Sequence, residues 1–109
     1  MDTIQLFDRC LDGRFLQCVM EVARLQSVRE AAKFLGLPPS LVSRKISDAE
    51  IRYSVTLFER TTHGLIPTEA GKVITEYARH QIEENKKILS YLSNQKYHHI
   101  NQISVHCGD

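Results

Sequence analysis

A cluster of short hydroxyl and basic side chains between residues 39 and 52 carries the strongest chemical signal in this sequence. Its members are Pro39, Ser40, Ser43, Arg44, Lys45, Ser47 and Arg52. Short serines let a helix backbone approach base edges and phosphates closely, and a guanidinium group binds either a guanine edge or a phosphate oxygen. The cluster therefore indicates binding to double-stranded DNA, with Arg44 able to read a base and with Lys45 and Arg52 as backbone contacts.

The residues that could support catalysis lack the neighbours that catalysis requires. Cys18 has no His or Asp placed to activate it, which favours a buried structural thiol. The acids Glu83 and Glu84 fit a solvated helix surface better than a paired-carboxylate site, and no phosphate-binding loop is present. The sequence therefore predicts that the chain is not an enzyme and that it holds no cofactor.

Basic charge is concentrated in the middle of the chain. The formal net charge of the 109 residues is only +1. Residues 14–67, however, carry eight basic and five acidic side chains, a net charge of +3, whereas residues 1–13 carry −2 and residues 68–109 are neutral. The basic excess therefore falls in the segment that contains the candidate DNA contacts.

Two helices are predicted ahead of the cluster. Apolar residues at three- and four-residue spacing predict a core helix that runs to about Leu25. Ser27 with Glu30 three residues later forms a capping box, and Gly36 provides a left-handed stop. A second helix of about two turns is therefore expected between Ser27 and Gly36.

The cluster itself falls on a predicted third helix. Pro38 and Pro39 suit the first helical positions, where a backbone N–H has no partner in any case. The apolar residues recur at helical spacing and are expected to face inward; they are Val42, Ile46, Ala49 and Tyr53. The serines and Arg44 then share the opposite face of this helix.

A β-hairpin and a long helix are predicted to follow. Leu57–Arg60 and Leu65–Pro67 are two short extended runs, and the turn between them has Thr62 and His63 at its tip. From Thr68, a suitable N-cap, a helical pattern continues to about residue 93. The hairpin would form the wing of a winged helix-turn-helix.

The long helix needs a surface beyond its own domain, because at 1.5 Å per residue it would extend roughly 40 Å. Residues spaced alternately by four and three positions favour a coiled-coil seam with a second copy; they are Ala78, Ile82, Asn85, Leu89 and Leu92. Asn85 would fix the register of that pair. The alternative is a helix that packs on its own domain, with Asn85 at the solvent edge.

After Asn94 the chain becomes polar, and Ile100, Ile103 and Val105 alternate as in one isolated strand. His98, His99, His106 and Cys107 lack the paired spacing of zinc ligands, so a tail is favoured over a metal site. No stretch approaches the roughly 20 apolar residues of a membrane-spanning helix, and the three cysteines are odd in number and far apart. A cytoplasmic protein is therefore expected.

Four sequence blocks between Ser27 and Gly71 resemble the N-terminal domain of LysR-type transcription regulators. The blocks S-V-R-E-A-A-K-F-L, L-V-S-R-K-I, L-F-E-R and P-T-E-A-G follow one another at the spacing of that family. The resemblance implies a mainly α-helical winged helix-turn-helix with a two-stranded β wing and a long C-terminal dimerisation helix. It also implies a dimer whose third helix enters the major groove while the wing reaches the minor groove.

The family's DNA contacts map onto Pro39, Ser40, Ser43, Arg44 and Lys45 in the recognition helix and onto Thr62 and His63 in the wing. Some positions depart from the family pattern. Pro38 and Pro39 replace a usual Ser-Gln, Ser54 replaces a glycine, and His63, whose charge depends on pH, replaces a common wing arginine. A different sequence preference and a lower affinity are therefore expected.

The predicted organisation is an extension at 1–13, a DNA-binding domain at 14–67, a linker and dimerisation helix at 68–94, and a tail at 95–109 that resembles the first strand of a missing effector domain. No small-molecule effector is expected in this chain. Two functions stay open at this point. One is a dimeric, sequence-specific regulator; the other is a truncated interaction module that pairs with full-length regulators and blocks them without binding DNA strongly.

Overall fold

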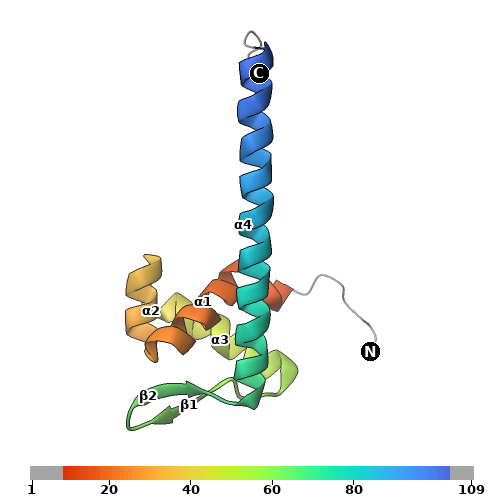
Figure 1. Cartoon of the computed structure of the whole chain (residues 1–109). Helices are drawn as coiled ribbons and strands as arrows, with labels where there is room; N and C mark the ends of the chain where they lie inside the picture. Colours follow the sequence, from red (N-terminus) through yellow and green to blue (C-terminus); the bar gives the residue numbers. More distant parts are fainter. Residues whose placement is uncertain (1–8, 104–109) are drawn as a thin grey trace. The chain divides into compact units, whose positions relative to one another are not determined.

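The computed structural model describes residues 9–103, and the chain divides into two compact units that meet between Arg79 and His80. The elements in chain order are η1 (Arg9–Leu11), α1 (Gly13–Leu25), α2 (Val28–Leu35), α3 (Pro39–Tyr53), β1 (Phe58–Thr61), β2 (Gly64–Pro67) and α4 (Glu69–Ile103) (Figure 1). This order confirms the mainly α-helical winged helix-turn-helix. None of the helices within residues 9–103 is both long and apolar enough to cross a membrane.

Helix α1 is held at its start by Asp12 and forms the centre of the core. The Phe15 N–H donates to Asp12 Oδ1 at 2.8 Å, which satisfies one of the unpaired donors of the first turn. Phe15, Val19 and Val22 have no exposed surface. Asp12 and Gly13 therefore belong to the folded domain, although the sequence placed them in an N-terminal extension.

Cys18 is buried in this core, as expected for a structural thiol. Burial raises the pKa of the thiol, and the opposing charges of Arg14 and Lys45 do not outweigh it. The thiol is therefore kept in its neutral, unreactive form.

The helix-turn-helix follows from local signals at both ends of α2. Ser27 Oγ accepts a hydrogen bond from the Glu30 N–H at 3.1 Å, as the capping box predicts. Gly36 ends the helix at φ 70°, and the Leu37 N–H then reaches the Ala32 carbonyl at 2.9 Å. Ala32 is 1% exposed, so small side chains allow the helices to pack closely.

Helix α3 begins where the proline pair predicts. Pro38 is the N-cap and Pro39 the first helical residue, with no side-chain capping bond. Val42, Ile46 and Ala49 are buried, as expected. Tyr53 is 38% exposed instead, because the helix ends there and its side chain lines an apolar groove of about 350 Å³ beside Val55 and Val73.

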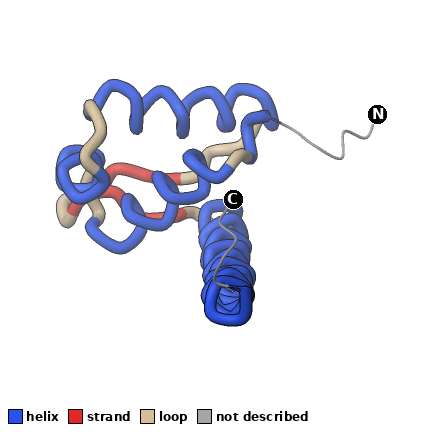
Figure 2. Tube along the Cα trace, turned by 90° about the horizontal axis from the view of Figure 1, so that it is seen from above, coloured by secondary structure: helices blue, strands red, loops and turns tan. Residues whose placement is uncertain are grey.

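The wing is an antiparallel pair of four-residue strands (Figure 2). The register pairs Phe58 with Pro67 and Thr61 with Gly64, within one residue of the expected runs. The Leu65 N–H donates to the Gln26 carbonyl at 3.0 Å, which ties β2 to the turn between α1 and α2. The wing is therefore attached to the helical body of the first unit.

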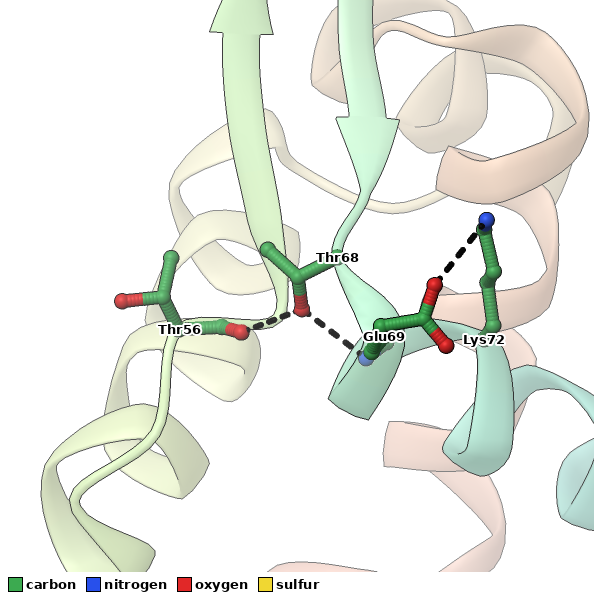
Figure 3. A network of polar contacts seen from close by, with 5 residues as sticks. Thr56, Thr68, Glu69 and Lys72 are labelled. Carbon is green, nitrogen blue, oxygen red and sulfur yellow. Dashed lines mark hydrogen bonds and ion pairs between the residues drawn. The ribbon is translucent and has the colours of Figure 1, made fainter.

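The junction between wing and α4 is fixed by Thr68 (Figure 3). Its hydroxyl donates to the Thr56 carbonyl at 2.5 Å and accepts from the Gly71 N–H at 3.0 Å, which confirms Thr68 as the N-cap. A Cβ at Gly71 would collide with the Leu57 carbonyl. Glycine at this position therefore permits the close contact between α4 and the segment that precedes β1.

Helix α4 continues to Ile103, ten residues beyond the predicted end near residue 93. Ile100 and Ile103 are helical, so the predicted isolated strand is wrong for these residues. No Gly or Pro interrupts the sequence after Gly71 within this helix, and a polar composition alone does not end a helix. Val105, His106 and Cys107 lie outside the described residues. Among the residues that are described, no three His, Cys, Asp or Glu side chains gather as metal ligands would.

Candidate nucleic-acid interface

The outer face of α3 presents the predicted cluster to solvent. Pro39, Ser40, Ser43, Arg44 and Ser47 are all exposed, whereas Val42 and Ile46, on the opposite face, are buried. The serines and Arg44 recur at three- and four-residue spacing, so they form one continuous surface along the helix. This surface is small, polar and basic.

Lys45 behaves differently from the other members of the cluster. Its side chain is only 29% exposed, and its Nζ donates to Asp12 Oδ2 at 3.0 Å. Burial acts to raise the pKa of Asp12, but the Phe15 N–H and the Lys45 ammonium group outweigh it and hold that pKa below its ordinary value. Lys45 thus forms an ion pair within the protein, and the DNA contact predicted from the sequence stays a prediction.

Arg52 lies at the C-terminal end of α3, away from the serines. Its side chain is exposed, and its guanidinium carbon lies 5.9 Å from the centre of the Tyr53 ring. Such a contact of a cation with an aromatic face orients the guanidinium group without removing it from solvent. Arg52 therefore extends the basic character of α3 to its last turn.

The wing presents Thr62 and His63 at its turn, as the sequence predicted. Thr61 Oγ1 accepts from the His63 N–H at 3.0 Å and donates to the Gly64 carbonyl at 2.9 Å. These two bonds hold the backbone of the turn, while the Thr62 and His63 side chains are exposed. The backbone of the turn is therefore constrained, while its two outer side chains face solvent.

Two further basic residues lie beside α3 and were not singled out from the sequence. Arg29 and Lys33, four residues apart on α2, line a hollow of about 290 Å³ together with Glu30, Ala32, Leu37 and Pro39. Both side chains are exposed. Their four-residue spacing, which places both on one face of α2, is the sequence signal that could have indicated them.

The predicted pairing residues of α4 divide between the two units. Ala78 is fully buried in the core of the first unit, where its small side chain packs closely against neighbouring elements. It is therefore not available to a second copy. In the second unit Ile82 is half-buried, Asn85 is exposed, and Leu89 and Leu92 are 63% and 52% exposed.

Two large, exposed apolar side chains of the second unit lie outside the four- and three-residue spacing of the predicted seam. Ile88 and Tyr91 are 56% and 59% exposed. Each lies next to a predicted seam residue in sequence, so the exposed apolar surface of this part of α4 is wider than the a and d positions alone.

Residues 14–72 match the family model described as bacterial regulatory helix-turn-helix protein, lysR family. A relative from Sinorhizobium fredii, named as the uncharacterized HTH-type transcriptional regulator y4mQ, is 38% identical over 86 residues, which are 79% of this chain and 28% of that protein. The chain thus spans less than a third of the length of this curated relative.

Solved structures share the same fold. The DNA-binding domain of CbnR, solved in a complex with DNA, is 26% identical, with a TM-score of 0.69 over 78% of this chain and 98% of that one. The DNA-binding domain of BenM, in its complex with catB site 1 DNA, is 24% identical, with a TM-score of 0.73 over 78% of this chain and 96% of that one. The chain therefore shares the fold of domains that were solved in complexes with DNA.

Proposed function

Because this chain belongs to the LysR family of DNA-binding transcription regulators, we propose that it binds specific double-stranded DNA sites as a homodimer, with α3 as its recognition helix. The observation that carries this proposal is the exposed surface formed by Ser40, Ser43, Arg44 and Ser47 on one face of α3. The major groove is wide enough for one helix, and short side chains let that helix lie close to the base edges.

Each side chain of this surface has a role that its chemistry favours. Arg44 reads a base, because its fork of donors matches the two acceptors of guanine. The serine hydroxyls and Arg52 contact phosphate oxygens, which fix the position of the helix on the duplex. Thr62 and His63 approach the neighbouring minor groove from the wing, as the family resemblance implies.

Two exposed basic side chains on α2 add to the phosphate contacts. Arg29 and Lys33 are exposed and lie on the side of α2 that faces the beginning of α3. Phosphate contacts carry no sequence information, but they supply much of the affinity and its salt dependence. The proposal therefore assigns base recognition to α3 and additional non-specific affinity to α2.

The second half of α4 is the surface that pairs two copies. Leu89 and Leu92 are more than half exposed, and large apolar side chains at helical spacing are stabilised when a second helix covers them. Ile82 and Asn85 continue this seam toward the DNA-binding domain, and Asn85 fixes its register. A two-fold dimer would bind two related half-sites, so the DNA target would be roughly palindromic.

The experiment that tests this proposal combines a binding measurement with a size measurement on the same protein. The purified chain is added to a labelled pool of 30-base-pair random duplexes in low salt, and its molar mass is measured by light scattering. A shifted fraction together with a dimer mass supports the proposal. A dimer that shifts no DNA would instead favour an interaction module, and a monomer would refute the proposed seam.

A further inference from the structure

One ion pair connects the recognition helix to a different element of the first unit. The Lys45 Nζ donates to Asp12 Oδ2 at 3.0 Å, across 33 positions of sequence. Pairs such as Lys72 with Glu69 join residues only three positions apart in one helix. The Lys45–Asp12 pair instead joins α3 to the N-terminal turn of α1.

Asp12 is a fixed anchor because both of its carboxylate oxygens have partners. Oδ1 accepts from the Phe15 N–H at 2.8 Å, while Oδ2 accepts from Lys45. Phe15 has no exposed surface, so the first turn of α1 cannot move without disturbing the core. The bond from the Phe15 N–H therefore holds the carboxylate independently of Lys45.

Lys45 lies between residues with opposite roles on α3. Arg44 is exposed on the surface assigned to DNA, whereas Ile46 is 7% exposed and packs in the core. The Lys45 ammonium group is directed toward α1 and its charge is matched by a carboxylate. An ammonium group paired in this way releases few counterions when DNA binds, so it contributes little to salt-dependent affinity.

We propose that Lys45 is a positioning residue and not a DNA contact: its ion pair with Asp12 holds α3 against α1 in the orientation that presents Ser43 and Arg44. This inference rests on the proposed function of α3. Asp12 lies outside residues 14–72 that match the family model, so the anchor is a property of this chain that the family match does not cover.

The test is a double-mutant cycle with two readouts. Asp12→Asn keeps an oxygen for the Phe15 cap but removes the charge, and Lys45→Gln removes the ammonium group. Thermal unfolding without DNA is measured for both single variants and for the double variant. Affinity is measured at several salt concentrations for a duplex that the wild-type protein selects from a random library.

The proposal predicts that the two single substitutions have equal effects and that the double variant has no larger effect. Each should lower DNA affinity about two- to fivefold, the range expected for a partly exposed ion pair, and leave the salt slope unchanged. Each should also lower Tm by about 2 to 5 °C. As a matched control, Arg44→Gln should weaken binding independently of Asp12→Asn.

Two results would overturn the proposal. One is a salt slope lowered by about one in Lys45→Gln, with Asp12→Asn binding as well as wild type or better, since this would make Lys45 a phosphate contact. The other is additive effects of the two substitutions on Tm. Failure of the protein to bind any duplex would refute the proposed function. The double-mutant cycle would still test the ion pair, because thermal unfolding is measured without DNA.

Discussion

Ser54 ends α3 in the same left-handed backbone conformation in which Gly36 ends α2, with φ angles of 53° and 70°. At both ends the next N–H reaches the carbonyl five residues earlier: Val55 donates to Glu50 at 3.1 Å, and Leu37 donates to Ala32 at 2.9 Å. A side chain with a Cβ is disfavoured in this conformation by about 1 kcal/mol or more, whereas glycine is not. The end of α3 is therefore strained where the end of α2 is not.

Ser54→Gly is predicted to stabilise the domain, because it removes this strain without removing a contact of the core. The free energy of unfolding in urea should rise by about 1 kcal/mol. Gly36→Ser should lower it by a similar amount, and Ser54→Ala, which keeps the Cβ, should give no gain. An unfolding midpoint of Ser54→Gly at or below that of wild type would contradict this account.

The stability contributed by Asp12 should depend on pH. Its folded-state pKa is lowered, so its contribution is present at neutral pH and is lost as pH falls through that lowered pKa. The difference in Tm between wild type and Asp12→Asn should therefore be largest near pH 7 and shrink below about pH 4. Melting curves at pH 7, 5, 4 and 3 test this, and a difference that stays constant over the series would contradict the assignment.

Local sequence signals were sufficient to predict the helices and strands that form the candidate nucleic-acid interface. The serine cap at Ser27, the glycine stop at Gly36 and the prolines at 38 and 39 each act within one or two helical turns, and the structure confirms all of them. The β-hairpin was found to within one residue. These features are predictable because their stabilising interactions join residues that are close in sequence.

Arg52→Ala should weaken DNA binding at every sequence to a similar extent. If Arg52 contacts a phosphate, its removal lowers the slope of log affinity against log salt by about one and leaves the sequence preference unchanged. Fluorescence anisotropy from 50 to 200 mM salt measures both quantities. Lys86→Ala in the second unit, which removes an exposed lysine outside the interface, is the matched control. An Arg52→Ala slope equal to that of the control would exclude Arg52 from the interface.

Leu89→Asp should dissociate the proposed dimer, because it places a charge on an apolar surface that a second helix would cover. Light scattering should then report a monomer. DNA affinity should fall, because a monomer can bind only one half-site at a time. Ser90→Asp changes the neighbouring residue, which lies away from the seam, and should stay dimeric. A Leu89→Asp protein that keeps the mass of a dimer would refute the proposed seam.

Contacts between residues far apart in the sequence, and the burial that they cause, could not be predicted from the sequence. The Lys45–Asp12 pair spans 33 positions, and no spacing rule connects its two members, so the sequence did not predict this ion pair. Tyr53 fits the helical period of the core but lies where α3 ends, and 38% of it is exposed. Ala78 fits the seam equally well, yet it is buried by its own domain. Each outcome is decided by tertiary packing, which periodicity does not contain.

Selection of bound DNA from a random library, performed in parallel with wild type and Arg44→Ala, is the sharpest test of DNA recognition by α3. Wild-type protein should enrich a site with two related half-sites. Arg44→Ala should lose preference at one position of each half-site and bind the best site more weakly by about 1 to 3 kcal/mol. Wild-type protein that enriches no sequence, or an Arg44→Ala protein that enriches the same site with the same affinity, would contradict recognition of DNA by α3.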